Sequence, residues 1–307
     1  RMRVPRGSIV PLPTPFTRDD ARVDWDALGR LIEFQIENGS HGLSCTGTTG
    51  EPSSLSRDER KAVVEFVKER VAGRVPFVPG TGSNNLDETL ELTRHAVELG
   101  VDGVLVIAPY YVRPNQHSLY DYFARVASEV ASLDPEVPVI LYNIPGRAAV
   151  DIAPATMGRL RREHPNVVGV KHATKNLDDV SYTFLAAGRD FAVYCGAETM
   201  TYPMLTLGGA GHISATGVVA PRAVARIYEL AAAGRWDEAR DLHFEMLELN
   251  DVLFIEVNPV PLKTALSLMG LCEARWRLPL GPMLPENRAK LVATLERYGL
   301  VGEGAPA

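Results

Sequence analysis

Residues 167–174, VVGVKHAT, run from apolar residues directly into a lysine and a histidine. Three of the four residues at 167–170 are valine, which is enriched in strands. Continuous rather than alternating apolarity is typical of a strand that is covered on both faces, as in parallel sheets. The segment therefore predicts a buried parallel strand with Lys171 near its carboxyl end.

Seven further runs of this kind recur along the chain, and a helical pattern follows each of them. They are SIVPLPTPF from residue 8, GLSCTGTT from 42, VPFVPGTG from 75, GVLVIAP from 103, PVILYNIP from 138, FAVYCGAE from 191 and GHISATG from 211. Eight strand–helix units over roughly 230 residues favour a (β/α)8 barrel, or TIM barrel, over an open doubly wound sheet. The sequence GTGSNN at residues 80–85 does not supply a dinucleotide fingerprint.

Three more helical patterns follow the eighth unit, around residues 236–251, 261–269 and 286–298. No linker, charge block or low-complexity stretch divides the 307 residues. We therefore predict an α/β fold with a barrel catalytic domain at residues 1–234. A C-terminal three-helix extension, residues 235–307, should pack on this barrel.

The composition, 46% hydrophobic and 23% charged, is that of a soluble globular protein. A net charge of −6 offers no basic field to nucleic acid or to an anionic membrane, so we expect small-molecule partners. Cys45, Cys195 and Cys272 lie far apart, which fits a reducing cytoplasm. Glycines and polar groups interrupt the longest uncharged run, residues 199–221, so we predict no membrane span.

The active site of a (β/α)8 barrel lies at the carboxyl ends of its strands. One amine and many hydroxyl groups are predicted there: Thr14, Thr48, Thr49, Thr81, Tyr110, Tyr111, Tyr142, Lys171, Glu198 and Ser214. The set holds no paired acids typical of glycosidases and no cluster of histidines and carboxylates for a metal. We therefore expect a site with no metal and no cofactor.

Lys171 is the candidate nucleophile. Burial disfavours the charged form of an amine, and a free amine can condense with a ketone to form an imine. Tyr142 ends the preceding strand, so its phenol can move protons at the imine carbon. The alternatives are a lysine that merely reaches solvent and a tyrosine that belongs to the core.

Two further groups are candidates for binding carboxylates. Thr48 and Thr49 lie in the glycine-flanked turn GTTGE, whose backbone N–H groups can converge on an anion. Arg147 follows the fifth strand of the pattern, where a guanidinium can hold a second carboxylate bidentately. A turn that only joins a strand to a helix and a solvated loop arginine are the alternatives. His172 points to the opposite side of its strand from Lys171, and we expect it to be structural.

Six ordered motifs make the chain resemble the dihydrodipicolinate synthase and N-acetylneuraminate lyase superfamily of Schiff-base enzymes. They are GTTGE at 47–51, PYYVRPNQ at 109–116, YNIPGR at 142–147, GVKHAT at 169–174, GGAGHISATGVVAP at 208–221 and NPVPLK at 258–263. The resemblance covers nearly the whole chain and implies a pyruvate-dependent enzyme.

The resemblance also implies catalytic roles. Lys171 would form the imine with pyruvate, which then becomes an enamine nucleophile. Tyr142 would relay protons together with Thr48 and with Tyr111, the last supplied by the partner subunit across a tight dimer interface. We therefore expect a homo-oligomer, either a dimer or a dimer of dimers, which would be a homotetramer.

Substrate binding is implied for a second set of residues. The turn at Thr48 and Thr49 would hold the pyruvate carboxylate, and Ile213 would line the pocket through its backbone carbonyl. The same turn adds three candidates for substrate binding: Gly47, Gly50 and Glu51.

Arg147 favours the synthases within this superfamily, because it would bind the carboxylate of aspartate 4-semialdehyde. The expected reaction condenses that aldehyde with pyruvate to 4-hydroxy-tetrahydrodipicolinate, in lysine biosynthesis. Three residues depart from the usual synthase pattern: Pro52, His172 and Cys195. Two alternatives therefore remain: an aldolase that acts on a 2-keto-3-deoxy sugar acid or another aldol substrate, and a barrel that binds a keto acid without turnover.

One further difference concerns regulation. Arg57 and Arg60 stand where lysine-inhibited members of the superfamily carry histidines, although Asn84 and Glu88 match the inhibitor site. We therefore expect feedback inhibition by lysine to be weak or absent.

Overall fold

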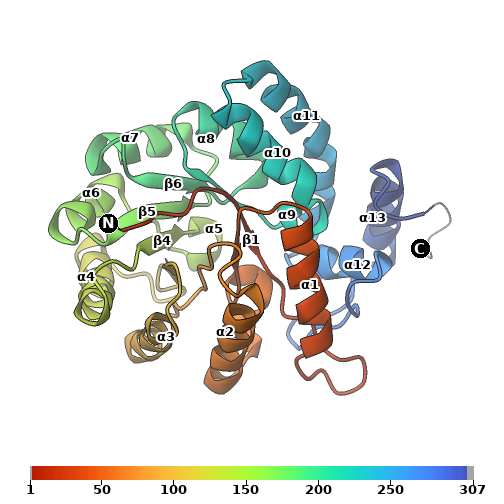
Figure 1. Ribbon diagram of the computed structural model, residues 1–307, viewed down its shortest axis with the longest axis horizontal. Coiled ribbons are helices and arrows are strands. Elements are labelled where there is room, and N and C mark those ends of the chain that lie inside the picture. The colour runs from red at the N-terminus through yellow and green to blue at the C-terminus, as the bar shows by residue number, and fades with distance from the viewer. Residues whose placement is uncertain (1, 303–307) are drawn as a thin grey trace.

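The computed structural model describes residues 2–302, and it contains a curled parallel sheet surrounded by helices (Figure 1). The sheet has seven strands within this range, in the order β2-β1-β7-β6-β5-β4-β3. They are β1 (Gly7–Pro11), β2 (Gly42–Ser44), β3 (Val104–Ile107), β4 (Val139–Asn143), β5 (Val167–His172), β6 (Ala192–Cys195) and β7 (Gly211–Ile213). The (β/α)8 barrel predicted from the sequence is confirmed, with a difference at its third strand.

The segment at residues 75–82, where the third of the eight barrel strands is expected, forms isolated parallel bridges instead of a continuous strand. Leu43 pairs with Phe77 on one side, and Gly80 pairs with Leu105 on the other, so this segment joins β2 to β3 and closes the ring. Pro76 and Pro79 lack an N–H and interrupt the regular ladder. The expectation of a full strand here was therefore wrong, although the segment occupies the predicted place.

Amphipathic helices form the outer ring. They are α1 (Trp25–Glu37), α2 (Arg57–Val71), α3 (Leu86–Glu98), α4 (Gln116–Leu133), α6 (Pro154–Glu163), α7 (Leu177–Ala187), α8 (Thr201–Thr206) and α10 (Pro221–Ala232). Ser56 and Glu59 form a capping box at the start of α2. Short helical turns follow several strands: η1 (Thr48–Gly50), η2 (Pro52–Ser54), α5 (Pro145–Ala148), η3 (Glu198–Met200) and α9 (Thr216–Val219).

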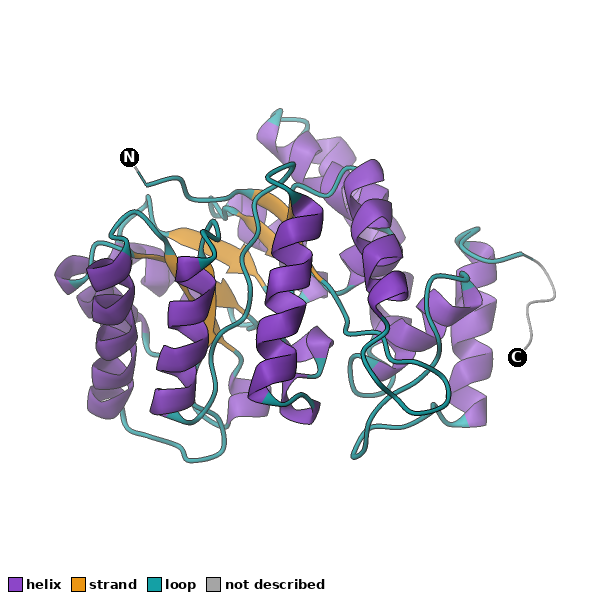
Figure 2. Cartoon of the chain, turned by 60° about the horizontal axis from the view of Figure 1, so that its bottom comes forward, coloured by secondary structure: helices purple, strands orange, loops and turns teal. Residues whose placement is uncertain are grey.

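The C-terminal extension consists of α11 (Trp236–Leu253), α12 (Val260–Leu268) and α13 (Pro285–Arg297). These three helices stand beside the barrel: α11 packs against α10 and α12 against α9, while α13 packs on α11 and α12 (Figures 1 and 2). Their number and places agree with the sequence pattern. The domain boundary at residue 234 stays a prediction.

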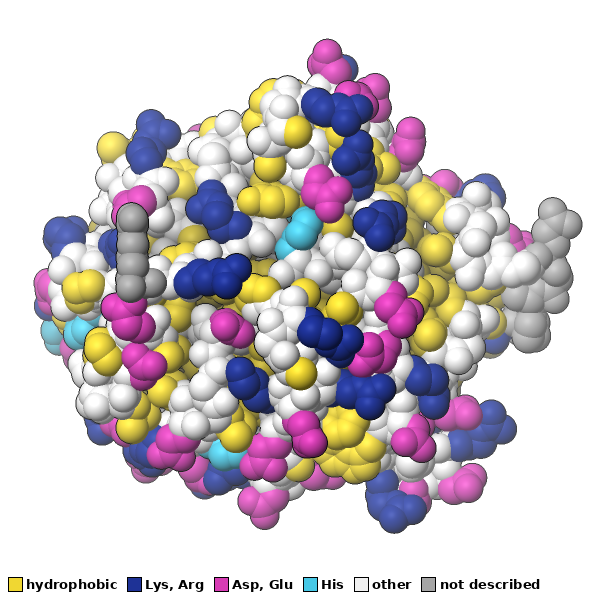
Figure 3. All heavy atoms as spheres, viewed as in Figure 1, with side chains coloured by type: hydrophobic (Ala, Val, Ile, Leu, Met, Phe, Trp, Pro, Cys, Tyr) yellow, Lys and Arg dark blue, Asp and Glu magenta, His cyan; other side chains and the backbone are white. Residues whose placement is uncertain are grey.

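Apolar side chains fill two regions, one between the sheet and the helices and one inside the barrel. The inner region includes Ile9, Leu105, Ile140, Val168 and Tyr194. Polar groups begin where this packing ends, at the carboxyl ends of the strands. No helix among residues 2–302 is both long and apolar enough to cross a membrane. Cationic and anionic side chains are interspersed over the face shown in Figure 3.

Candidate active site

Lys171 and Tyr142 lie side by side at the carboxyl ends of two neighbouring strands. They are paired in register across β4 and β5. Only 6% of Lys171 and 3% of Tyr142 are exposed, and Lys171 Nζ lies 4.1 Å from the centroid of the tyrosine ring. The amine is therefore sheltered and does not extend into bulk water.

The phenol of Tyr142 continues into a second hydroxyl group. Its oxygen lies 3.0 Å from Thr48 Oγ1, with either group able to donate. Thr48 begins the η1 turn directly after β2. Amine, phenol and hydroxyl thus lie together at one mouth of the barrel, and their catalytic roles stay predictions.

The turn at residues 47–51 has the geometry of the first turn of a helix, and its leading backbone amides are free of internal hydrogen bonds. Its first internal hydrogen bond runs from Gly50 N to the carbonyl of Gly47, at 2.8 Å, so the amides of Thr48 and Thr49 precede that bond. The Thr14 hydroxyl donates to the carbonyl of Gly50 at 2.7 Å and fixes the end of the turn. Such a turn presents amides suited to a carboxylate.

Glu51 ends this turn in a left-handed conformation, with φ of 54°. Its buried carboxylate lies 2.5 Å from the buried ammonium of Lys263 on α12. Burial raises the pKa of the Glu51 carboxyl, and Lys263 opposes that rise. The geometry favours a supporting role for Glu51, because its charge is already paired within the chain.

Arg147 lies on α5, directly after β4, and its side chain is exposed. The guanidinium donates to the backbone carbonyl of Asn258 at 3.0 Å. Arg147 and Thr48 line one cavity of about 540 Å³. Other residues of its wall are Glu51, Pro52, Ile107, Tyr110, Tyr111, Asn258, Pro259 and Leu280.

Tyr111 is 84% exposed in the single chain, and its backbone has a φ of 76°. Its amide donates to the carbonyl of Ala148 at 3.0 Å, which holds the loop beside Arg147. Among the described residues, no hydrogen bond joins its hydroxyl to Thr48 or Tyr142. The chain alone therefore leaves Tyr111 outside the set of connected hydroxyl groups.

Ile213 and Glu198 complete the mouth on the side of β7. Ile213 ends that strand and is buried. Glu198 Oε1 accepts from the amide of Ala215 at 2.8 Å. Burial raises the pKa of the Glu198 carboxyl, while backbone amides and the nearby charge of Lys171 act against this. Gly196 leaves room for the lysine, because a Cβ there would come within 3.1 Å of Lys171 Cγ.

Two residues near the site were not predicted as site residues, namely Asn258 and Lys263. Both belong to the motif NPVPLK in the C-terminal extension. Asn258 Nδ2 donates to Thr49 Oγ1 at 3.0 Å, and Lys263 pairs with Glu51. The motif itself was visible in the sequence, but its contacts span more than two hundred positions, with a separation of 209 for Asn258 and Thr49.

His172 is buried on the other side of β5 from Lys171, as expected for a structural residue. Burial lowers the pKa of its imidazole. No group of three or more His, Cys, Asp or Glu side chains within residues 2–302 is placed to hold a metal ion.

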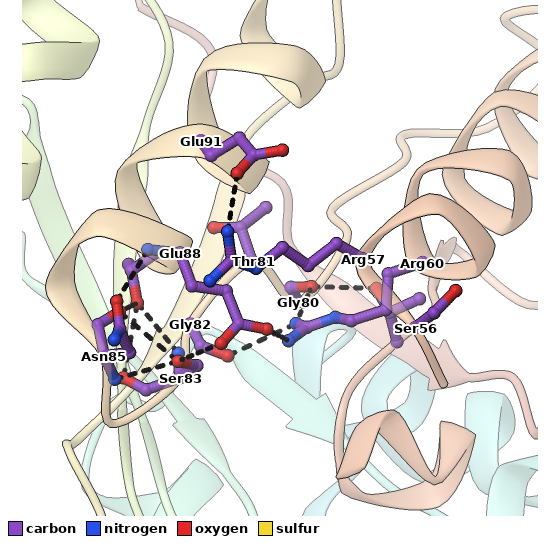
Figure 4. A network of polar contacts seen from close by, with 12 residues as sticks. Ser56, Arg57, Arg60, Gly80, Thr81, Gly82, Ser83, Asn85, Glu88 and Glu91 are labelled. Carbon is purple, nitrogen blue, oxygen red and sulfur yellow. Dashed lines mark hydrogen bonds and ion pairs between the residues drawn. The ribbon is translucent and has the colours of Figure 1, made fainter. Parts of the chain in front are cut away.

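The residues at the positions of the lysine-inhibitor site, introduced in the sequence analysis, form a separate polar network (Figure 4). The buried Arg60 donates to the carbonyls of Gly80 and Gly82, each at 3.2 Å, and lies 3.8 Å from a carboxylate oxygen of Glu88. Arg57 pairs with Glu91 at 3.1 Å. Acceptors in this region are thus already bound by side chains of the chain itself.

Comparison with known proteins gives a consistent result. The model of the dihydrodipicolinate synthetase family matches residues 4–298. A 4-hydroxy-tetrahydrodipicolinate synthase of Thermus thermophilus is 55% identical over 96% of this chain and 97% of that protein. The crystal structure of dihydrodipicolinate synthase from Aquifex aeolicus has a TM-score of 0.93 and 43% identity, over 97% of this chain and all of the other. The 4-hydroxy-tetrahydrodipicolinate synthase of Methylacidiphilum fumariolicum has a TM-score of 0.92 and 40% identity, over 96% of both chains.

Proposed function

The chain belongs to the dihydrodipicolinate synthetase family, and from this premise we propose that it condenses pyruvate with aspartate 4-semialdehyde to 4-hydroxy-tetrahydrodipicolinate. It is a class I lyase that acts through a lysine imine. The observation that carries this function is the sheltered amine of Lys171 against Tyr142, whose phenol is hydrogen-bonded to Thr48.

The first step joins pyruvate to the chain. The uncharged Nζ of Lys171 attacks the ketone carbon, and the oxygen leaves as water after two proton transfers, which gives an imine. The carboxylate of pyruvate is held by the amides and hydroxyl groups of Thr48 and Thr49. Loss of a methyl proton then converts the imine into an enamine.

Tyr142 is the group placed to move these protons. Its hydroxyl is bonded to Thr48, so a proton released at one end can be replaced at the other. The enamine carbon then attacks the aldehyde carbon, and the new alkoxide takes up a proton from this relay. The amino group of the aldehyde substrate next attacks the imine carbon, which closes the ring and releases Lys171.

Arg147 holds the carboxylate of the aldehyde. Its guanidinium uses one N–H for Asn258, and its fork geometry suits bidentate binding of a carboxylate. Arg147 and Thr48 line the same cavity, which supports binding of two carboxylates in one reaction.

The relay reaches solvent through Tyr111 of a second subunit in this proposal. Tyr111 and Val112 are 84% and 59% exposed, and large apolar side chains in this position suit an interface between copies. A tetramer built as a dimer of such dimers is the proposed assembly. Mixing K171A chains with Y111F chains tests the arrangement, because each mixed dimer would regain one complete site, whereas a tyrosine acting within its own chain would restore none.

We place the enzyme in the cytoplasm. Cys45, Cys195 and Cys272 are buried and free, and burial raises the pKa of each thiol to about 12. Buried reduced thiols suit a reducing compartment.

Borohydride reduction in the presence of pyruvate tests the proposed mechanism. Reduction should fix pyruvate irreversibly on Lys171, and peptide mass spectrometry should locate it there. A coupled assay with pyruvate and aspartate 4-semialdehyde, compared with cleavage of 2-keto-3-deoxy sugar acids, identifies the aldehyde. An adduct on another lysine, or turnover of sugar acids alone, would contradict the proposal.

A further inference from the structure

Asn258 contacts both groups that are placed to bind carboxylates. Its side-chain Nδ2 donates to Thr49 Oγ1 at 3.0 Å, and its backbone carbonyl accepts from Arg147 at 3.0 Å. We propose that Asn258 is a positioning residue that sets the spacing between the pyruvate turn and Arg147, and thereby selects aldehydes that carry a carboxylate. This inference rests on the proposed function.

Arg147 needs such an anchor because its side chain is exposed. A long solvated side chain samples many rotamers, and ordering it on substrate binding costs conformational entropy. The bond to the Asn258 carbonyl restricts the guanidinium before the aldehyde arrives. Its remaining N–H groups keep the geometry needed for a carboxylate.

Asn258 also holds Thr49, through its side-chain amide. The threonine is 3% exposed, and the Asn258 amide fixes its hydroxyl oxygen. The backbone of Thr49 forms the turn whose amides face the expected carboxylate of pyruvate. Asn258 therefore links the pyruvate turn to Arg147, since its side chain contacts the one and its carbonyl contacts the other.

The segment that carries Asn258 is fastened to the barrel at a second point. Lys263, five residues further on, forms the buried ion pair with Glu51, two residues after Thr49. Lys263 Nζ also donates to the carbonyl of Arg275 at 3.0 Å. Because this second attachment does not involve the Asn258 side chain, removal of that side chain should leave the extension docked.

The expected effect is a loss that depends on the aldehyde. Without the amide, the Asn258 carbonyl and Arg147 lose their fixed relation to the turn. A misplacement of about 1 Å can cost up to about 100-fold in rate. We expect N258A to lower kcat/KM for aspartate semialdehyde about tenfold or more. Butanal lacks a carboxylate, so its kcat/KM should fall by about threefold or less.

The experiment uses the full chain with pyruvate and either aldehyde. Steady-state kcat and KM are measured for the wild type, N258A, R147A and the double variant N258A/R147A. N287A is the matched control, because Asn287 also donates an amide hydrogen bond within the extension, to Glu256 at 2.9 Å. Thermal unfolding and borohydride trapping of pyruvate at Lys171 are measured for every chain.

A positioning role predicts that the two substitutions are strongly non-additive. The loss caused by N258A with aspartate semialdehyde should shrink, in the R147A background, to the loss seen with butanal. N287A should leave kcat/KM unchanged for both aldehydes. Equal losses with both aldehydes, or full additivity with R147A, would overturn the inference while trapping at Lys171 upholds the proposed function. A wild-type chain that traps no pyruvate would overturn both.

Discussion

The hydroxyl of Tyr142 lies 3.0 Å from the hydroxyl of Thr48, while its ring faces the amine of Lys171. A phenol held in this way can take a proton from the substrate and pass another through the threonine. Proton transfer by a positioned side chain contributes about 100-fold or more to a rate. The bond is therefore the centre of the proposed relay.

Replacement of Tyr142 by Phe should lower kcat about 100-fold or more with little change in the KM for pyruvate. Steady-state kinetics measure this split. Thr48→Val should cause a smaller loss, because the phenol keeps its place beside the imine. Borohydride should still fix pyruvate on Lys171 in both variants. A Tyr142→Phe chain with wild-type kcat would rule out the phenol as proton carrier.

The barrel and its central residues could be predicted because they depend on local pattern. The run at residues 167–170 indicated a buried strand, and the order of strands in a barrel then placed Tyr142 beside Lys171. Pro76 and Pro79 are evident in the sequence, but how far they interrupt the ladder depends on the neighbouring strands, so the pattern alone predicts a full strand.

The supporting contacts could not be predicted from pattern. Asn258 contacts Thr49 only because α12 docks on the mouth of the barrel. Contacts between such distant segments produce no periodic residue pattern from which they could be predicted. Glu51 belongs to the turn, so substrate binding is predicted for it, and the sequence pattern does not reveal its ion pair with Lys263. The role proposed for Tyr111 involves a second subunit, which the single chain does not contain.

Replacement of Arg147 by Ala should discriminate between charged and neutral aldehydes. Loss of a bidentate pair with a carboxylate should lower kcat/KM for aspartate semialdehyde about 100-fold. Turnover of butanal should change by less than about threefold, since it offers no charge to the guanidinium. Arg147→Lys serves as a control that keeps the charge without the fork. Equal losses with both aldehydes would indicate a structural role for Arg147.

Lysine should inhibit this enzyme weakly. The ammonium groups of a bound lysine need carbonyl and carboxylate acceptors, and Arg60 already occupies those of Gly80, Gly82 and Glu88 (Figure 4). Titration of the steady-state rate with lysine measures the inhibition constant. A low-micromolar constant would contradict this expectation. Arg57→Ala is the comparison variant, because Arg57 pairs with Glu91 on the surface and blocks none of those acceptors.

Removal of Lys263 should destabilise the fold through Glu51. Replacement of one partner of a buried ion pair leaves an uncompensated charge, so Lys263→Met should lower the free energy of unfolding by about 3–5 kcal/mol. Urea denaturation measures the change. The double variant E51Q/K263M should recover much of the loss, because it leaves no buried charge. Failure of that recovery would show that the ammonium acts mainly through the Arg275 carbonyl.

Acid should destabilise the protein through a buried histidine. His212 on β7 is fully buried, and burial lowers the pKa of its imidazole to about 3 from an ordinary value of 6.5. The unfolded chain therefore binds a proton at this position before the folded chain does. Its contribution to stability is complete above pH 6.5 and declines by about 1.4 kcal/mol for each pH unit below it, until the folded imidazole titrates.

In the window from pH 6.5 to 5 the unfolded imidazole takes up its proton, while carboxyl groups of ordinary pKa stay ionised. His172, whose pKa is also lowered by burial, adds a slope of the same sign. His212→Asn should therefore reduce the dependence of the free energy of unfolding on pH by about 1.4 kcal/mol per unit, measured by urea denaturation across this window. His117→Asn is the control, since His117 is exposed on α4. An identical slope in His212→Asn would mean that the imidazole takes up its proton equally in the folded and the unfolded chain, which would contradict this prediction.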